Sequence, residues 1–273
     1  MLLAGVDFTS RPSRRKPETV ALGRAVAGGV ELLRVERHAS FDSLGQWLHS
    51  PGPWLAAFDF PFGLPRALVA GLGWPDEWLP LMRHYGALSR PEIRSTFRAW
   101  CNARAAGDKF AHRACDRVAR SSPSMKWVQP PVAYMMHAGV GLLIDAGVDI
   151  PRLHRGDPTR VAVEGYPALL AREFVAGRSY KSDERPRQTA DREAGRAAIV
   201  DALALGRGRL GVALTMTAEQ RAELVAEGSA DGLDACLCLV QAAWAAGRAD
   251  HGLPAEVDPI EGWIVTAMPS FGA

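Results

Sequence analysis

Residues 55–65, LAAFDFPFGLP, contain a short apolar run that meets a carboxylate and then stops at proline and glycine. The run from Leu55 to Phe58 is typical of a buried β-strand, and we expect that strand to cover residues 54–60. Burying an unpaired carboxylate costs several kcal/mol, so a core strand carries one only for a reason. Asp59 is therefore a candidate functional residue.

Three strands are expected before this stretch. Residues 2–8 (LLAGVDF), 19–27 and 30–37 are each rich in aliphatic residues. Gly28-Gly29, between the second and third, is a dipeptide expected of a tight hairpin turn with positive φ. The first part of the chain therefore predicts a three-stranded meander.

A short helix is expected between the meander and residues 54–60. Ser40 is a typical N-cap residue, and residues 41–49 place their large apolar side chains on one helical face. The predicted order is three strands, one helix and a fourth strand.

Residues 66–158 have a different character, with prolines and tryptophans between helix-like segments. Between positions 90 and 126 there are nine lysines and arginines against three acids, a local net charge of +6. We interpret residues 66–158 as a basic helical insertion in the sheet domain.

The strand pattern returns at residues 159–165, TRVAVEG, which again end in an acid, Glu164. A helix follows that Gly177 is expected to end. Further helices are predicted at 189–205, 217–227 and 231–247, and the tail EGWIVTAMP (261–269) is expected to add a last strand.

The composition is that of an ordinary globular protein, with 48% hydrophobic and 23% charged residues among 273. The net charge of the whole chain, +2, does not by itself indicate a polyanionic partner. The four cysteines include no CxxC pair, and free thiols favour a reducing compartment. No run is apolar enough to cross a bilayer, and the N-terminus lacks the basic region of a signal peptide. We therefore expect a cytoplasmic protein without a membrane partner.

Five carboxylates stand at the ends of predicted elements. Three of them end strands and two share one face of the last helix's first turn; they are Asp7, Asp59, Glu164, Asp231 and Asp234. In a partly buried site they would repel one another unless a cation neutralised them. Oxygen ligands without histidine or cysteine suit Mg²⁺ or Mn²⁺ better than zinc. Two such ions about 4 Å apart promote phosphodiester hydrolysis, so the five acids are the candidate catalytic set, and Asp7, Asp59, Glu164 and Asp234 the candidate metal ligands.

Each of these acids also has a structural interpretation. Asp231 or Asp234 alone is the typical cap of a helix N-terminus. Asp7 can begin an Asx turn, and Asp59 can accept bonds from nearby loop N–H groups. Glu164 can pair with one of the many arginines. The combination, rather than any single acid, favours a metal site.

Four motifs, in this order, resemble the family labelled domain of unknown function 429, regarded as predicted nucleases of the RNase H-like fold. They are GVDFT (5–9), AAFDFPFGLP (56–65), VEGYP (163–167) and DGLDA (231–235). The resemblance extends over nearly the whole chain. It implies one RNase H-like α/β domain over residues 1–273: an antiparallel three-stranded meander plus parallel strands, flanked by helices, with 66–158 as the insertion.

The resemblance also implies roles for the acids. RNase H-like nucleases carry one acid on the first strand, one on the fourth, and one or two on the last helix. Asp7, Asp59 and Asp234 match those places, and Asp231 supplies the second helix acid. Glu164, on the fifth predicted strand, is an extra acid that the family's motif includes. The insertion exceeds what the core fold requires, so the resemblance implies no particular nucleic acid.

Basic and aromatic residues near these acids are candidate substrate contacts. The loop after Asp7 carries Arg11, Arg14 and Arg15, which are placed to reach a phosphate over the metals. The +6 region would extend that surface along a nucleic-acid backbone, with Arg98 on its charged face. The alternative is that these arginines simply coat a helix surface.

Two further residues are candidates for the same role. Trp100 can stack on a base, although its helical spacing from Phe97 is more typical of a core face. Lys181 is a candidate partner for the leaving phosphate, with an ordinary surface lysine as the alternative.

The expected function is therefore that of a Mg²⁺- or Mn²⁺-dependent nuclease acting on nucleic acid. Two other functions stay open: a phosphotransferase or hydrolase of nucleotides or small phosphate esters on the same fold, and a non-enzymatic nucleic-acid-binding module. The scattered histidines argue against a zinc hydrolase, and the sequence contains no GxSxG of a serine hydrolase.

Overall fold

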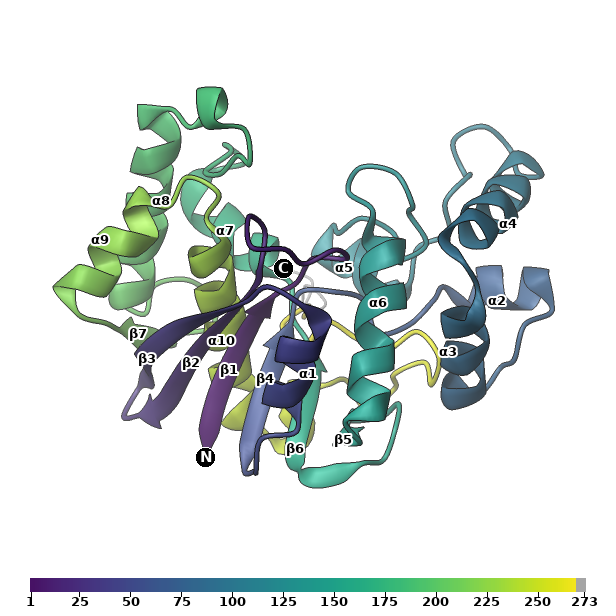
Figure 1. The fold of residues 1–273 in the computed structure, drawn as a ribbon, viewed down its shortest axis with the longest axis horizontal. Coiled ribbons are helices and arrows are strands. Elements are labelled where there is room, and N and C mark those ends of the chain that lie inside the picture. Colours follow the sequence, from purple (N-terminus) through teal and green to yellow (C-terminus); the bar gives the residue numbers. More distant parts are fainter. Residues whose placement is uncertain (269–273) are drawn as a thin grey trace, which may run out of the picture.

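A seven-stranded mixed sheet forms the centre of the computed structural model, which describes residues 1–268 (Figure 1). The order across the sheet is β5-β6-β4-β1-β2-β3-β7. β1, β2 and β3 are antiparallel neighbours, whereas β4 is parallel to β1 and to β6, and β7 is parallel to β3. The strands are β1 (Leu2–Asp7), β2 (Glu18–Val26), β3 (Gly29–His38), β4 (Trp54–Phe58), β5 (Val148–Asp149), β6 (Asp157–Glu164) and β7 (Ala213–Thr215).

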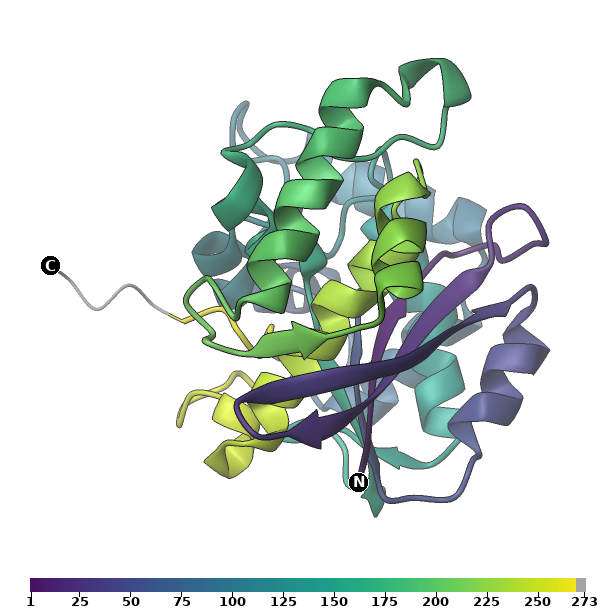
Figure 2. The same cartoon turned by 90° about the vertical axis from the view of Figure 1, so that its left-hand side faces the viewer.

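Helices cover both faces of this sheet. α1 (Phe41–Leu48) and α6 (Val132–Asp145) share a core with one face, and α2 (Arg66–Leu72), α3 (Trp78–Ala87) and α4 (Arg90–Asn102) extend that core outward. α7 (Pro167–Val175), α8 (Ala190–Ala204), α9 (Ala218–Ala226) and α10 (Asp231–Ala246) share a core with the other face, where α8 and α9 pack against each other beside β7 (Figure 2). The remaining helices are α5 (Ala114–Ala119) and the 3₁₀ helices Arg185–Arg187 and Ala249–Gly252.

Successive side chains of β1 point alternately to the two faces of the sheet. Ala4 and Val6 belong to the core under α1 and α6, and Leu3 belongs to the core under α10. Gly5 faces α10 as well, and the two backbones touch there: a Cβ at Gly5 would lie 2.1 Å from Ala235 O and 2.1 Å from Leu239 N. α10 can therefore pack directly on β1 only because position 5 has no side chain.

The meander, the first helix and the fourth strand are confirmed. Gly28 has φ +75° in the hairpin turn, and the Ser40 side chain caps α1 by accepting a bond from Ser43 N. Strand β4 ends at Phe58, so Asp59 directly follows it rather than lying inside it. The predicted helices after residue 165 are present to within two residues at each end.

Two strands were missed and one was predicted wrongly. β5 and β7 have two and three residues, which is too short for a periodic pattern. Glu164 consequently lies on the sixth strand rather than the fifth. Of the tail, residue 269 lies outside the described residues, and the rest forms only an isolated parallel bridge between Ile264 and Glu164.

Residues 66–158 form α2 to α6, β5 and the first two residues of β6. Val140 and Leu143 of α6 belong to the same buried cluster as Ala4 of β1, so this basic segment completes one layer of the sheet's own core. In the described part of the chain, no helix is long and apolar enough to cross a membrane.

Candidate functional site

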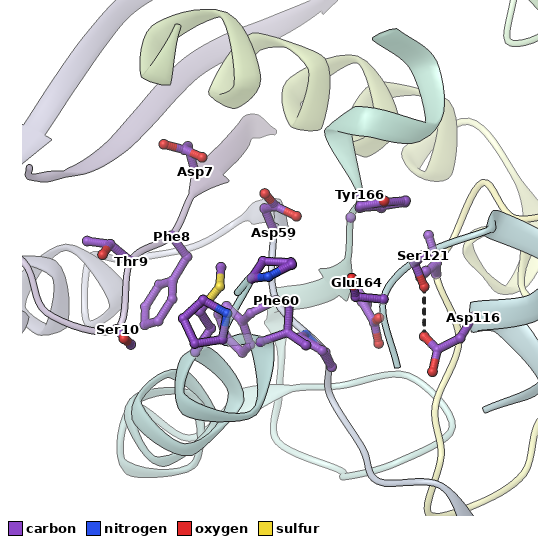
Figure 3. A pocket seen from close by; sticks show the side chains of 18 of the residues that line it. Asp7, Phe8, Thr9, Ser10, Asp59, Phe60, Asp116, Ser121, Glu164 and Tyr166 are labelled. Atoms are coloured by element: carbon purple, nitrogen blue, oxygen red, sulfur yellow. Dashed lines mark hydrogen bonds between the residues drawn. The ribbon is translucent and has the colours of Figure 1, made fainter. Parts of the chain in front are cut away.

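Asp7 and Asp59 stand side by side at the ends of neighbouring parallel strands. Val6 of β1 pairs with Phe58 of β4, and Asp59 N donates to Val6 O at 2.9 Å, so the next residue of each strand lies at the same level. Asp7 alternates with Gly5 and therefore faces the α10 side of the sheet. Both carboxylates line one wall of a cavity (Figure 3). Two strands thus bring two acids together without any contact between their side chains.

The first turn of α10 adds two more acids above this pair. Asp234 is fully buried, and it accepts hydrogen bonds from Tyr180 Oη at 2.6 Å and from Lys181 Nζ. Asp231 is 6% exposed and accepts a bond from Lys16 Nζ at 2.6 Å. Neither carboxylate caps the helix, whose N-terminus has no side-chain cap. Their partners are cations and a phenol, so the capping interpretation is wrong for both.

The two strand carboxylates have little compensation of their own. Burial raises the pKa of Asp7 well above its usual value, and the negative charges of Asp234, Asp231 and Asp59 raise it further. Burial raises the pKa of Asp59 to about 7, while Lys181 opposes the shift. Within residues 1–268 no donor forms a hydrogen bond to either side chain. Neither the Asx turn at Asp7 nor the loop bonds at Asp59 are therefore present, and a cation would be stabilised between these acids.

Glu164 points to the other side of the sheet. It pairs in register with Phe58, whose side chain packs in the core under α1 and α6, rather than with the position of Asp59. Its Oε1 accepts a bond from Arg113 Nη2 at 2.6 Å and its Oε2 accepts one from Arg113 Nη1 at 2.8 Å. Arg113 also donates to Asp116, at 2.9 Å to Oδ1. The arginine-paired interpretation of Glu164 is confirmed.

A cavity of about 330 Å³ connects Asp7 and Asp59 with Glu164. Its polar wall holds Asp7, Asp59 and the two lysines that contact the α10 acids, Lys16 and Lys181. The opposite walls come from the loop after β1 and from the start of α6, with apolar and small side chains. Glu164 and Asp116 lie farther along the same cavity (Figure 3). The site therefore combines a strongly acidic corner with two lysines that are paired to the acids of α10.

Lys181 belongs to this site and is not an ordinary surface lysine, since its ammonium group contacts the buried Asp234. Arg11 and Arg98 line a second, adjoining groove rather than the acidic corner. Arg14 and Arg15 are exposed at the loop tip and line neither cavity.

Trp100, the aromatic candidate for substrate contact, lies away from the acidic corner. Trp100 lines neither cavity; it is half-buried against α2, with the Arg104 guanidinium 4.3 Å from its ring centre. Phe97 is fully buried in the core, as its helical spacing indicates.

Three site residues carry no signal in the sequence. Lys16 stands in a loop with three arginines, Tyr180 precedes a lysine in an irregular segment, and Arg113 is one of nine basic residues between positions 90 and 126. Their partners are 215, 54 and 51 residues away along the chain, respectively. Only the fold identifies them.

The donor set suits a hard divalent cation, because every candidate ligand at the acidic corner is a carboxylate oxygen. As the side chains lie, no three acidic, histidine or cysteine residues in the described range surround a single point. Asp234 is held by Lys181 and Tyr180, so an ion that takes Asp234 has to compete with Lys181.

Comparison with known proteins gives one match. The model of a family described as "Protein of unknown function (DUF429)" matches residues 5–258. Neither the curated proteins nor the solved structures contain a significant match. The matched range includes all five acids and both lysines of the site.

Proposed function

The chain belongs to the DUF429 family, and we propose that it is a divalent-metal-dependent nuclease of the RNase H-like fold that hydrolyses phosphodiester bonds. One observation carries the proposal. Asp7 and Asp59 are adjacent carboxylates without hydrogen-bond donors among residues 1–268, and the negative charge of Asp234 is close enough to raise the pKa of both. Burial and mutual repulsion favour the protonated form of such carboxylates, and a divalent cation bound between them would stabilise the charged form beyond what Lys181 provides.

The order of the secondary structure supports the RNase H-like part of the proposal. An antiparallel meander β1–β3 is followed by parallel β4 and β6 beside β1, with helices on both faces. The acids follow the first and fourth strands and begin the long helix α10. These are the places that the resemblance assigns to the acids of such nucleases.

Asp7, Asp59 and Asp234 would hold Mg²⁺ or Mn²⁺, with Asp231 beside them. Bound there, such ions supply an activated water and neutralise the charge that develops on the leaving oxygen. Glu164 is left out of this set, because both of its oxygens already accept bonds from Arg113. Lys181 and Lys16 stand at the rim, where their positive charge attracts a phosphate and holds it against the acids.

The test is cleavage of a labelled panel of single strands, duplexes, RNA–DNA hybrids and four-way junctions with Mg²⁺ or Mn²⁺. The wild type is expected to cleave at least one member, and Asp7→Asn protein, purified in parallel, is expected to cleave none while melting at a temperature no lower than the wild type. Equal rates for both proteins would overturn the proposal, because contamination or another site would then be responsible.

The cavity volume favours a second candidate, a hydrolase or phosphotransferase acting on a nucleotide or a small phosphate ester. About 330 Å³ is at the lower end of the range for small-molecule pockets. This candidate predicts metal-dependent turnover of a small phosphate ester without any effect of added nucleic acid. A third possibility, a binding module without catalysis, predicts salt-dependent nucleic-acid binding that survives loss of the acids, and no metal-dependent turnover of any member of the panel.

A further inference from the structure

A second groove, of about 920 Å³, adjoins the site cavity. Ser10 and Pro131 line both, so the two spaces meet at the loop after β1 and at the N-terminal end of α6. Four arginines line the groove: Arg11, Arg90, Arg94 and Arg98. We call it the arginine groove. No aspartate or glutamate is among its lining residues.

Helix α4 gives the arginine groove its length. Arg90, Arg94 and Arg98 recur every four residues, which places them on one face of the helix at intervals of about 6 Å. The adjoining face of α4 is buried, with Ile93, Phe97 and Cys101 in the core. The three guanidinium groups are therefore held in a row on a fixed support, with a spacing comparable to that of neighbouring phosphates along a nucleic-acid strand.

These charges are not neutralised within residues 1–268. Arg11, Arg94 and Arg98 form no ion pair there, whereas exposed arginines elsewhere, such as Arg24 and Arg34, pair with nearby glutamates. Burial lowers the pKa of Arg90, and the like charge of Arg11 lowers it further. Repulsion of this kind is relieved when an anion binds between the groups.

Arg90 also fixes the junction between the two spaces. It donates to Ser10 O in the loop that follows Asp7, and its guanidinium lies 5.1 Å from the ring centre of Tyr134 on α6. The loop, α4 and α6 are thus joined at the point where the arginine groove opens into the site cavity. The arginine groove therefore has a defined position relative to Asp7.

We propose that the arginine groove binds consecutive phosphates of a nucleic-acid strand whose next phosphodiester lies at Asp7 and Asp59. This inference rests on the proposed nuclease function and narrows its substrate to a polynucleotide, which extends beyond a cavity of about 330 Å³. In this proposal the arginine groove only binds the strand and takes no part in the hydrolysis.

The test is fluorescence anisotropy of a labelled, single-stranded 12-nucleotide oligothymidylate, with EDTA present so that no turnover occurs. The double variant Arg94→Gln/Arg98→Gln is expected to bind the single strand about tenfold or more weakly at 50 mM salt. Its salt dependence, the slope of log K against log[salt], should fall by about 1.4, since each phosphate contact on a single strand contributes roughly 0.7. A labelled dinucleotide should bind the wild type and the double variant equally weakly.

Arg24→Gln/Arg34→Gln is the matched control, because it removes two exposed arginines of β2 and β3 that line neither cavity. It should bind like the wild type. Unchanged affinity and slope in the Arg94/Arg98 variant would overturn the inference, and so would equal competition by polyglutamate, which would indicate an acidic protein partner. Because binding is measured without metal, Asp7→Asn should retain it. If the wild type binds the strand but cleaves no member of the panel, the nuclease proposal fails and the groove assignment stands.

Discussion

Arg113 donates to both carboxylate oxygens of Glu164, at 2.6 Å to Oε1 and 2.8 Å to Oε2, across 51 residues of chain. All three charged groups of this network, including Asp116, are at most 3% exposed. Burial raises the pKa of Glu164, and the arginine opposes that shift. The contact joins strand β6 to the segment before α5, and so anchors the far end of the site cavity.

Replacing Arg113 by methionine should destabilise the protein strongly. Glu164 and Asp116 would remain buried without their cation, and removing one partner of a buried ionic network costs about 3–5 kcal/mol. Urea denaturation followed by circular dichroism measures the loss. Arg221→Met, which removes an exposed partner of Asp201, should cost less than about 1 kcal/mol. Equal stability of the two variants would contradict the structural role of Arg113.

Glu164→Gln should leave the affinity for Mn²⁺ within about a factor of two, because Glu164 faces away from the acidic corner. Asp7→Asn should reduce the same affinity by at least about tenfold, since it removes a proposed ligand. Titration of the metal-free protein with Mn²⁺, followed by electron paramagnetic resonance, compares the two variants. A large loss in Glu164→Gln would place Glu164 back among the ligands.

Mn²⁺ binding should strengthen as the pH rises toward neutrality. Asp59 has a pKa of about 7 in the folded protein, raised by burial, so below that pH a proton competes with the metal for its carboxylate. The affinity should rise by up to about tenfold per pH unit between pH 5.5 and 7 through Asp59, and the raised pKa of Asp7 adds to the rise. Isothermal titration calorimetry at a series of pH values measures it. A flat profile in the wild type would show that Asp59 is not a ligand; in Asp59→Asn a weaker and flatter profile is expected.

Lys181→Met should increase the affinity for Mn²⁺ and lower the stability of the metal-free protein. The ammonium group of Lys181 occupies Asp234, so its removal frees a buried carboxylate for the metal. Loss of this partly exposed ion pair should cost about 1–2 kcal/mol without metal. Thermal melting with and without Mn²⁺ reports both effects, and the exposed Lys109→Met should change neither. A lower Mn²⁺ affinity in Lys181→Met would refute the competition between lysine and metal.

Glu18 should make the protein less stable as the pH rises. Burial raises the pKa of Glu18 to about 8, so the folded state retains a proton that the unfolded state releases near pH 4.5. Between these values this group lowers the free energy of unfolding by up to about 1.4 kcal/mol per pH unit, and the loss is complete above pH 8. Glu18→Gln keeps an acceptor for Thr9 N, which lies 2.8 Å from Glu18 Oε2, and should remove that part of the slope. Urea denaturation at pH 6, 7.5 and 9 tests this; identical slopes in both proteins would show that Glu18 is ionised.

The sequence predicts those parts of this fold that come from local periodicity and turn chemistry. The apolar runs around Asp7 and Asp59, the glycine pair at the hairpin turn and the Ser40 cap are all local signals, and each element appears where expected. β7 pairs with β3 over three residues only, so tertiary contact determines it rather than its own sequence.

The site, too, is predicted only as far as local sequence signals determine it. That acids follow strands is visible in the sequence, but the face to which each acid points depends on the register between strands. Glu164 pairs with Phe58, one position before Asp59, and this single step places it on the opposite side of the sheet. Lys16 and Arg113 meet their partners through contacts distant in sequence, for which no spacing rule exists.

The contact between Gly5 and α10 has a consequence for how this sequence can vary. The atoms that a Cβ at Gly5 would meet are backbone atoms, Ala235 O and Leu239 N, so no smaller side chain on the helix can make room for it. Any substitution at Gly5 has to move α10 as a whole, and with it Asp234, away from Asp7. Position 5 therefore controls the distance between Asp7 and Asp234, although it carries no functional group. We expect glycine to be retained there in every homologue whose function requires both acids.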